Sequence, residues 1–438
     1  MSVTEPVPLT AAPPVQASAL LRWYVLIAMV GVYTLSIADR YVISTVLEPI
    51  RLELHLSDSG IGFLTGVSLA LFYVFFGFPL SWLIDRYNRR YIIAISVVAW
   101  SVMTVTCGLS RNYWQLLVSR IGVGIGEAGG TPGANSILSD YFPVARRPMA
   151  LGVFALGAPI GAWFGADIAG QIADAYGWRT VFLWFGIPGV LFGLLLYLTI
   201  REPRRGQLDH NTKAAAPPLL ESFRYLWQQR ACVHVMIGSA LTALWGWGLM
   251  WWTPAFLMRN YGLSPGEAGA ITGPIHLVAG IAATAVTAWV IGTRWMSHPK
   301  RILWLMGTGV GIGTIATAVI YSTHSLALTT TLFWVFIPTI YFYIGPSFGL
   351  VNNLAEPRMR AIFCATTLFL ANVGNLIVAP QLVGWLSDTF APNHVPDAHS
   401  LRLALLCLVP TGLWSSFHFF WATRRIVQDQ ERATGVKV

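Results

Sequence analysis

Twelve apolar stretches of about 20 residues limit what this chain can fold into. Their approximate limits are 21–47, 60–84, 91–109, 113–138, 149–173, 179–200, 231–257, 267–293, 302–321, 326–350, 361–386 and 402–423. A helix rises 1.5 Å per residue, so about 20 residues cross the roughly 30 Å hydrocarbon core of a bilayer. Lipid offers no partner to unpaired backbone groups, which favours helices over strands. With 55% hydrophobic and only 11% charged residues, the sequence predicts an all-α integral membrane protein.

The distribution of basic residues predicts the topology. Net charge is +9, but the basic residues form no continuous stripe of the kind that binds nucleic acid. Most of the 28 lysines and arginines fall on the side that carries both termini, which is therefore expected to be cytoplasmic. The exceptions are Arg51, Arg111, Arg179, Arg259 and Arg402 on the other side and Arg40 and Arg120 within spans.

The ends of the chain and its loops favour a bacterial inner membrane. Residues 1–20 carry Glu5 as their only charge and lack the basic start of a signal peptide, so we expect a disordered cytoplasmic tail. No Asn-x-Ser/Thr acceptor occurs, and the predicted external loops are short.

A hydrophilic segment, 201–230, divides the spans into six and six. Gly170-Gln-Ile-Ala-Asp174 ends the fifth span, and Gly384-Trp-Leu-Ser-Asp388 ends the eleventh, about half a chain length later. Parallel repeats of this kind are typical of transporters with a central cavity between two halves. We therefore predict six-helix bundles over 21–200 and 231–425, a cytoplasmic linker over 201–230 and a cytoplasmic tail over 426–438.

Two pairs of ionisable residues interrupt the first and fourth apolar spans. Asp39 and Arg40 lie in the first span, and Arg120 and Glu127 lie in the fourth. An ionisable group at bilayer depth costs at least roughly 2.5 to 3.5 kcal/mol unless it is paired or hydrated, and such residues are usually functional. Helical rise places Asp39 level with Arg120 and Glu127 roughly 10 Å deeper. Asp39 beside an arginine and Glu127 among glycine and apolar residues have opposed environments, which suits a proton relay.

We therefore hypothesise that Asp39 and Glu127 accept protons. Arg120 would exchange between the two acids and an anionic substrate head group. The alternative is a fixed ion pair that only locks helices one and four together. Arg40 and His276, in the eighth span, are secondary candidates for proton or substrate binding.

The loop between the second and third spans reads Ser81-Trp-Leu-Ile-Asp85-Arg86-Tyr87-Asn88-Arg89-Arg90. It resembles the cytoplasmic loop signature of the major facilitator superfamily, with Ser81 and Asn88 where glycine is usual. Asparagine tolerates a left-handed backbone, so the tight turn can survive. The resemblance implies a gate formed by Asp85, Arg86, Asn88, Arg89 and Arg90; the alternative is a positive-inside loop without a moving part.

The segment from Arg120 to Ala128 reads Arg-Ile-Gly-Val-Gly-Ile-Gly-Glu-Ala and resembles the signature of spinster-type transporters of that superfamily. Other similar segments follow in the same order and are Asp39-Arg40-Tyr41, Asp85 to Arg89, Arg201 to Gly206 and Trp252 to Arg259. The resemblance implies export of lysophospholipid or sphingoid-like lipids driven by protons. The sequence departs from the animal pattern in Gly129 to Gly133 and in the second gate loop, 292–301, which lacks an acid.

Aromatic residues in the seventh and tenth spans are candidates for the cavity wall. They are Trp245, Trp247, Trp251, Tyr341 and Tyr343. Such a wall suits an acyl chain, whereas core packing or an interfacial belt is the alternative. Glycines 122 to 130 also match a loose dinucleotide-binding pattern, but no strand precedes them, so close helix packing is the better interpretation.

Together these features predict a proton-coupled secondary transporter that moves an amphipathic, lipid-like solute by alternating access. A drug:proton antiporter is the nearest alternative. A membrane-embedded lipid-modifying enzyme is a distant one, because no His-x4-Asp, paired metal-ligand histidines or serine nucleophile elbow occurs on the cytoplasmic loops. We expect no metal and no cofactor besides the coupling proton, a monomer, and the bilayer and an amphipathic small molecule or lipid as partners.

Overall fold

The computed structural model describes residues 18–143, 146–203, 218–356, 358–392 and 395–434, and these residues form helices and connecting loops without a strand. The predicted tail over 1–20 lies almost entirely outside this part of the chain. The first half of the chain contains α1 (Ala19–Thr45), α2 (Leu47–Leu54), α3 (Asp58–Gly62), η1 (Phe63–Val67), α4 (Ser68–Arg86), α5 (Arg89–Leu109), α6 (Tyr113–Glu127), α7 (Gly130–Tyr141), α8 (Arg147–Ala155), α9 (Gly157–Trp163), η3 (Phe164–Ile168), α10 (Ala169–Tyr176) and α11 (Trp178–Thr199).

The second half has a similar series of helices. It contains α12 (Leu219–Gln228), α13 (Arg230–Thr242), η4 (Ala243–Trp247), α14 (Gly248–Tyr261), α15 (Pro265–Ile291), η5 (Arg294–Met296), α16 (Pro299–Ser322), α17 (Leu326–Phe342), α18 (Ile344–Asn353), α19 (Arg360–Asn372), η6 (Val373–Val378), α20 (Ala379–Phe390), α21 (Ala398–Ala422) and α22 (Ile426–Thr434). The segments η1, η3, η4 and η6 are π-helical, and η5 is a 3₁₀ turn.

The predicted twelve-helix membrane architecture is confirmed. Eleven continuous helical stretches of the described chain are long and apolar enough to cross a membrane. The twelfth span consists of α6 and α7, which are separated at Ala128 and Gly129 directly after Glu127. Interrupted spans are tolerated where the break faces protein or a cavity.

Polar side chains start several of these helices. Ser18 accepts a hydrogen bond from the backbone of Leu21, and Asn112 accepts one from Gln115. Ser264 with Glu267 and Asp397 with Ser400 form capping boxes at the starts of α15 and α21. Each cap satisfies backbone N–H groups that the first helical turn leaves unpaired.

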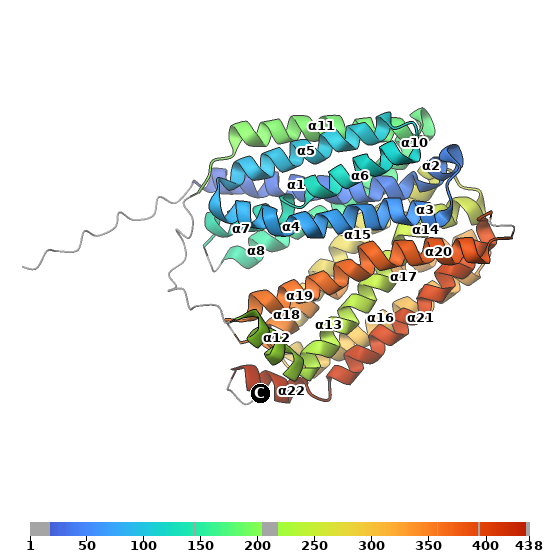
Figure 1. Ribbon diagram of the computed structural model, residues 1–438. Helices are drawn as coiled ribbons and strands as arrows, with labels where there is room; N and C mark the ends of the chain where they lie inside the picture. The colour runs from blue at the N-terminus through green and yellow to red at the C-terminus, as the bar shows by residue number, and fades with distance from the viewer. Residues whose placement is uncertain (1–17, 144–145, 204–217, 357, 393–394, 435–438) are drawn as a thin grey trace, which may run out of the picture.

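The two halves form two bundles that lie one above the other in Figure 1. We call the end with residue 18, α12 and α22 the tail end, and the end with α2, α3 and the start of α15 the far end. At the far end α20 packs on α3, and α15 packs on α10 and η3, so that the halves are in contact. Toward the tail end the halves diverge (Figure 1).

Two predicted irregular segments contain helices. The segment 201–230, expected as a linker, includes α12, and the segment 426–438, expected as a tail, includes α22. Both helices are amphipathic, and their apolar residues pack on the tail end of the second bundle through Leu226 and Ile426. A short helix of this kind gains its stability from packing, which local sequence does not reveal.

Candidate functional site

A cavity of about 300 Å³ lies between the two bundles. Residues of α1 and α9 line one wall, and residues of α13, η4, α14, α17, α18, α19 and η6 line the other. A small cleft beside it shares Arg40 and Trp251 with this cavity. A cavity that both halves line is the place where a two-bundle transporter binds its solute.

An ion pair joins α1 to the end of α6 at the wall of this cavity. Arg40 donates to Glu127 Oε2 from Nη2 at 2.7 Å and from Nε at 2.9 Å. The Glu127 side chain is fully buried, and that of Arg40 is 16% exposed. The guanidinium also lies over the Tyr73 ring, 5.2 Å from its centroid. Among the described residues, Arg40 thus makes the ion pair that joins the ionisable residues of the first span to those of the fourth.

Arg120 and Asp39 lie deeper inside the first bundle. Asp39 Oδ2 accepts a hydrogen bond from Thr104 Oγ1 at 3.2 Å. Arg120 is 1% exposed, and its Nε and Nη2 have no hydrogen-bond partner in the described chain; nor has Glu127 Oε1. Buried donors without partners are costly, so the arrangement retains unused capacity to bind an anion or a water molecule.

This pairing differs from the expected one, in which Arg120 contacts the acids. Arg120 lies two turns before Glu127 on the same helix, roughly 10 Å away along its axis, beyond the reach of a direct hydrogen bond. Arg40 reaches Glu127 because α1 packs on α7, which begins shortly after Glu127.

Glycines let α6 approach α5 closely, as the packing interpretation predicts. A Cβ on Gly126 would come within 2.7 Å of the backbone of Trp100, and one on Gly122 would come within 2.5 Å of the Met103 sulfur. Direct helix contact of this kind fixes the position of Glu127 relative to α5.

His276 sits in an aromatic cluster that joins the two halves. Its Nδ1 lies 2.9 Å from Tyr341 Oη, and its Nε2 lies 3.4 Å from Tyr41 Oη. Tyr41 comes from α1, directly after Arg40, and packs on Trp251 with ring centroids 5.1 Å apart. We use aromatic cluster for Tyr41, Trp247, Trp251, His276 and Tyr341, whose rings contact one another.

Of the aromatic residues proposed for the cavity wall, Trp247, Trp251, Tyr341 and Tyr343 line it. Trp245 does not; it is buried inside the second bundle, where Nε1 donates to Thr317 Oγ1 at 3.1 Å and the ring packs on Phe336. Two residues along a helix turn the side chain through about 200°, so Trp245 and Trp247 point in opposite directions.

The sequence analysis missed several polar residues of the cavity and of the small cleft beside it, where Ser44 lies. Ser44 Oγ donates to the Trp251 carbonyl at 2.5 Å, and Trp251 Nε1 donates to Asn375 Oδ1 at 2.7 Å. Asn372 and Asn375 also line the cavity. Their amides inside an otherwise apolar span were the available signal, since polar groups at bilayer depth usually face a cavity.

The loop between α4 and α5 is held by its arginines. Arg89 is 2% exposed and pairs with Asp140 at 2.6 Å and with Glu202 at 2.7 Å, joining α5 to α7 and to the segment after α11. Arg90 donates to the Ile200 carbonyl at 3.0 Å, and the Arg86 guanidinium stacks on Trp82. The Asp85 side chain lies outside the described part of the structure, so its predicted gate role stays a prediction.

Asn88 does not need a left-handed backbone. Its φ is −65° and its ψ is 112°, an extended conformation directly before α5. The expected tolerance of asparagine for positive φ therefore has no part in this turn.

At the far end, one arginine of the second half closes on two acids of the first. Arg259 donates to both carboxylate oxygens of Asp58 at 2.7 Å, and its Nη2 lies 2.6 Å from Glu48 Oε2. Arg51 pairs with Glu48 at 2.7 Å. Sequence reasoning placed Arg51 and Arg259 outside the membrane but did not identify this network.

The two similar motifs at 170–174 and 384–388 each end in an aspartate that caps a helix of the opposite half. Asp388 accepts from the backbone N–H groups of Asp58 and Ser59 at 2.9 and 2.8 Å, at the start of α3. Asp174 accepts from Gly266 N at 3.0 Å and from Ser264 Oγ at 2.5 Å, at the start of α15. Carboxylates are stabilised at helix N-termini, so each motif forms a latch between halves.

Also on the far-end helix α2, Glu53 forms hydrogen bonds with residues of α11. Trp178 Nε1 and Arg179 Nη1 donate to its two carboxylate oxygens at 2.7 and 2.6 Å. These hydrogen bonds hold the pKa of Glu53 below its ordinary value, and the bond from Trp178 has the largest effect.

Comparisons with known proteins agree with this geometry. The family model of the Major Facilitator Superfamily matches residues 29–380. The crystal structure of a bacterial homologue of the human lysosomal transporter spinster, in an inward-facing and unoccupied conformation, is similar with a TM-score of 0.83. It is 30% identical, and the match covers 94% of this chain and 99% of that chain.

Curated relatives are similar over most of their length. An MFS-type efflux pump of Mycolicibacterium smegmatis is 28% identical, with 87% of both chains covered. Protein spinster homolog 3 of Danio rerio is 26% identical, with 94% of this chain and 87% of the relative covered. The chain belongs to the Major Facilitator Superfamily and, within it, to the spinster-type transporters. It is a transporter and not an enzyme.

Proposed function

We propose that the protein is a proton-coupled secondary transporter of an amphipathic, lipid-like solute. The observation that carries the proposal is the buried ion pair between Arg40 and Glu127 at the wall of the cavity between the halves. A proton on Glu127 neutralises the carboxylate that holds Arg40. The hydrogen bonds between the two side chains then become weaker, because hydrogen bonds to an ionised partner are stronger than those to a neutral one. The state of this acid thereby decides whether Arg40 is available to a solute.

Two exchangeable partners give the coupling. When Glu127 is ionised, Arg40 is paired with it. When Glu127 is protonated, the guanidinium of Arg40 can turn to an anionic head group in the cavity. Asp39, with Thr104 and the nearby charge of Arg120, is the second proton acceptor. In this scheme the proton on Glu127 favours binding of the solute to Arg40, and their joint binding shifts the populations of the two access states.

The cavity wall supports an amphipathic solute. The aromatic cluster offers apolar surface, whereas Arg40, Ser347 and Asn375 offer polar contacts in the same cavity. We prefer a lysophospholipid or sphingoid-type lipid because of the spinster family. A drug:proton antiporter is the second candidate, favoured by the relative that is called an efflux pump.

The structure then corresponds to a state open toward the cytoplasm. Basic residues concentrate at the tail end, as the positive-inside distribution requires of a cytoplasmic face. The seal lies at the opposite end, where Arg259 joins the halves. We place the protein in a bacterial inner membrane with both termini in the cytoplasm.

The test is a proton-flux assay with purified protein in liposomes that contain a pH-sensitive dye. Lysophospholipids, sphingoid bases and cationic drugs are added in turn to wild type, Asp39→Asn and Glu127→Gln. Glu221→Gln, which changes an exposed acid on α12, is the matched control.

We expect lipid-dependent proton flux in wild type and the control and at least about a tenfold loss in Glu127→Gln, a size typical of losing a proton-transfer group. Flux that responds only to cationic drugs would favour the antiporter. Solute transport without proton flux, or flux unchanged in both variants, would return the charges to a structural role.

A further inference from the structure

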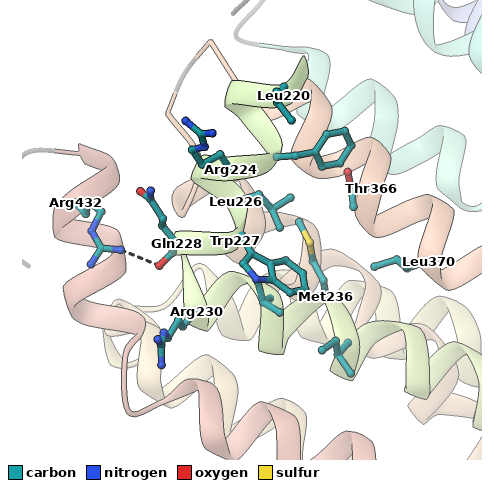
Figure 2. A pocket seen from close by; sticks show the side chains of 13 residues that line it. Leu220, Arg224, Leu226, Trp227, Gln228, Arg230, Met236, Thr366, Leu370 and Arg432 are labelled. Atoms are coloured by element: carbon teal, nitrogen blue, oxygen red, sulfur yellow. Dashed lines mark hydrogen bonds between the residues drawn. The ribbon is translucent and has the colours of Figure 1, made fainter. Parts of the chain in front are cut away.

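A second and larger concavity lies on the outside of the second bundle at the tail end. It has a volume of about 1190 Å³ and runs between α12, the start of α13 and α19 (Figure 2). Its apolar walls include Trp227, Met236 and Leu370. We call it the tail-end groove.

Helix α12 exposes large apolar side chains beside this groove. Leu220 is 74% exposed and Trp227 is 75% exposed, whereas Ser222 and Leu226 on the other face are buried against the bundle. A helix with this division, at the end of membrane-spanning helices, lies in the plane of the membrane interface. Acyl chains of the bilayer are therefore the expected cover for the apolar side of the groove.

Unpaired arginines line the same groove. Arg224 and Arg230 are exposed and form no hydrogen bond or ion pair with any residue that the structure describes. Figure 2 shows Arg224 on α12 and Arg230 at the start of α13, toward opposite ends of α12 and both on the side away from Trp227 and Met236. Arg432 of α22 adds a third guanidinium, tied to the Gln228 carbonyl at 3.0 Å and to Asp429 at 3.2 Å.

We propose that the tail-end groove binds an anionic phospholipid of the bilayer. One acyl chain lies along Trp227, Met236 and Leu370, and the anionic head group lies on the side of the groove that carries the exposed guanidinium groups of Arg224 and Arg230. Basic pockets between membrane helices on the cytoplasmic side are suited to anionic head groups, and the apolar floor beside free arginines matches such a lipid in both charge and hydrophobicity.

This site is separate from the cavity of the proposed transport cycle. Helix α19 forms the wall between them, with Thr366 and Leu370 facing the groove and Thr367 and Leu368 facing the cavity. The proposal therefore does not depend on which solute is transported.

Native mass spectrometry of the purified full-length protein tests the site. Phosphatidylglycerol and phosphatidylcholine with identical acyl chains are titrated separately into wild type and Arg224→Gln/Arg230→Gln. The control is Arg294→Gln/Lys300→Gln, which removes two exposed charges at the same end, away from the groove. Because the side chains of Arg224 and Arg230 form no ion pair within the part of the chain that the structure describes, we expect their replacement to leave folding intact, and the apparent Tm without added lipid checks this.

We expect wild type and control to retain one phosphatidylglycerol more tightly than phosphatidylcholine. The groove variant should bind phosphatidylglycerol about 30-fold more weakly, since two arginines near an anionic head group are lost. Equal retention of the two lipids by wild type, or equal phosphatidylglycerol binding by the groove variant, overturns the proposal. A dimer of the chain that excludes lipid, or preference for a lysolipid over both phospholipids, overturns it as well.

Discussion

At the scale of single residues, two arginines in one bundle have different surroundings. Arg40 is engaged by Glu127, whereas the Nε and Nη2 atoms of buried Arg120 have no hydrogen-bond partner among the described residues. Removing one partner of a buried ion pair leaves an uncompensated charge, which costs more than the pair itself contributes. Arg40 is therefore engaged with an acid, whereas Arg120 has donors that can bind another group.

Replacing Arg40 by alanine should destabilise the protein because Glu127 stays buried without its counter-charge. We expect a loss on the order of 3 kcal/mol, seen as a lower apparent Tm in tryptophan-fluorescence melts. Adding Glu127→Gln to this variant should recover most of the loss, since a neutral amide needs no cation.

Arg111→Ala serves as the control because its side chain is exposed at the far end. A double variant as unstable as Arg40→Ala alone would show that Arg40 acts through packing and not through the charge of Glu127.

At the scale of helices, the contacts between the halves follow the repeat. In each latch a glycine starts the motif and an acid ends it. A Cβ on Gly384 would overlap the carbonyl oxygen of Asp58, and one on Gly170 would overlap that of Pro265. The glycines thus bring the helices close enough for Asp388 and Asp174 to cap the opposite half.

Gly384→Ala should push α20 from α3 and weaken the seal by about 2 kcal/mol, the usual cost of overpacking. Spin labels at Leu52 and Val395, both exposed at the far end, report the separation of the halves in a background without the native cysteines. We expect a larger long-distance fraction than in the parent.

The matched substitution is Gly152→Ala, because no atom lies within 4 Å of the added methyl position. An unchanged distance distribution in Gly384→Ala would mean that the latch yields without opening the seal.

At the scale of the whole molecule, the far-end network joins the two halves at one end. Among the described residues, Arg259 is the charged member that the second half contributes to this network, where Ser387 also donates to Asp58. Glu48, Arg51 and Asp58 come from the first half. Opening the far end separates Arg259 from both acids, so the network biases the protein toward the present conformation.

Arg259→Gln should shift the population toward far-end opening by roughly 100-fold, the equivalent of about 3 kcal/mol for a buried charge network. The same spin-label pair measures the shift. Arg402→Gln is the control, since Arg402 contacts Asn260 and His324 within its own half. If the distance distribution of Arg259→Gln equals that of the parent, helix packing alone keeps the far end closed.

Sequence alone determined the spans, their number and the division into halves. Hydropathy along about 20 residues is a local property, because each span must satisfy its own backbone in lipid. The expected limits consequently lie within a few residues of the helices, as for α1 and α16. The identity of the family also followed from a contiguous motif, Arg120 to Ala128.

Only the tertiary structure decided which charges meet. The sequence placed Asp39 level with Arg120 and Glu127 roughly 10 Å deeper, but the partner of Glu127 depends on how α1 is rotated toward α6. The same holds for Trp245 and Trp247, which point to the core and to the cavity. Helix rotation and the contact of residues as distant as Arg259 and Asp58 are set by packing between elements, and no local pattern in the chain encodes them.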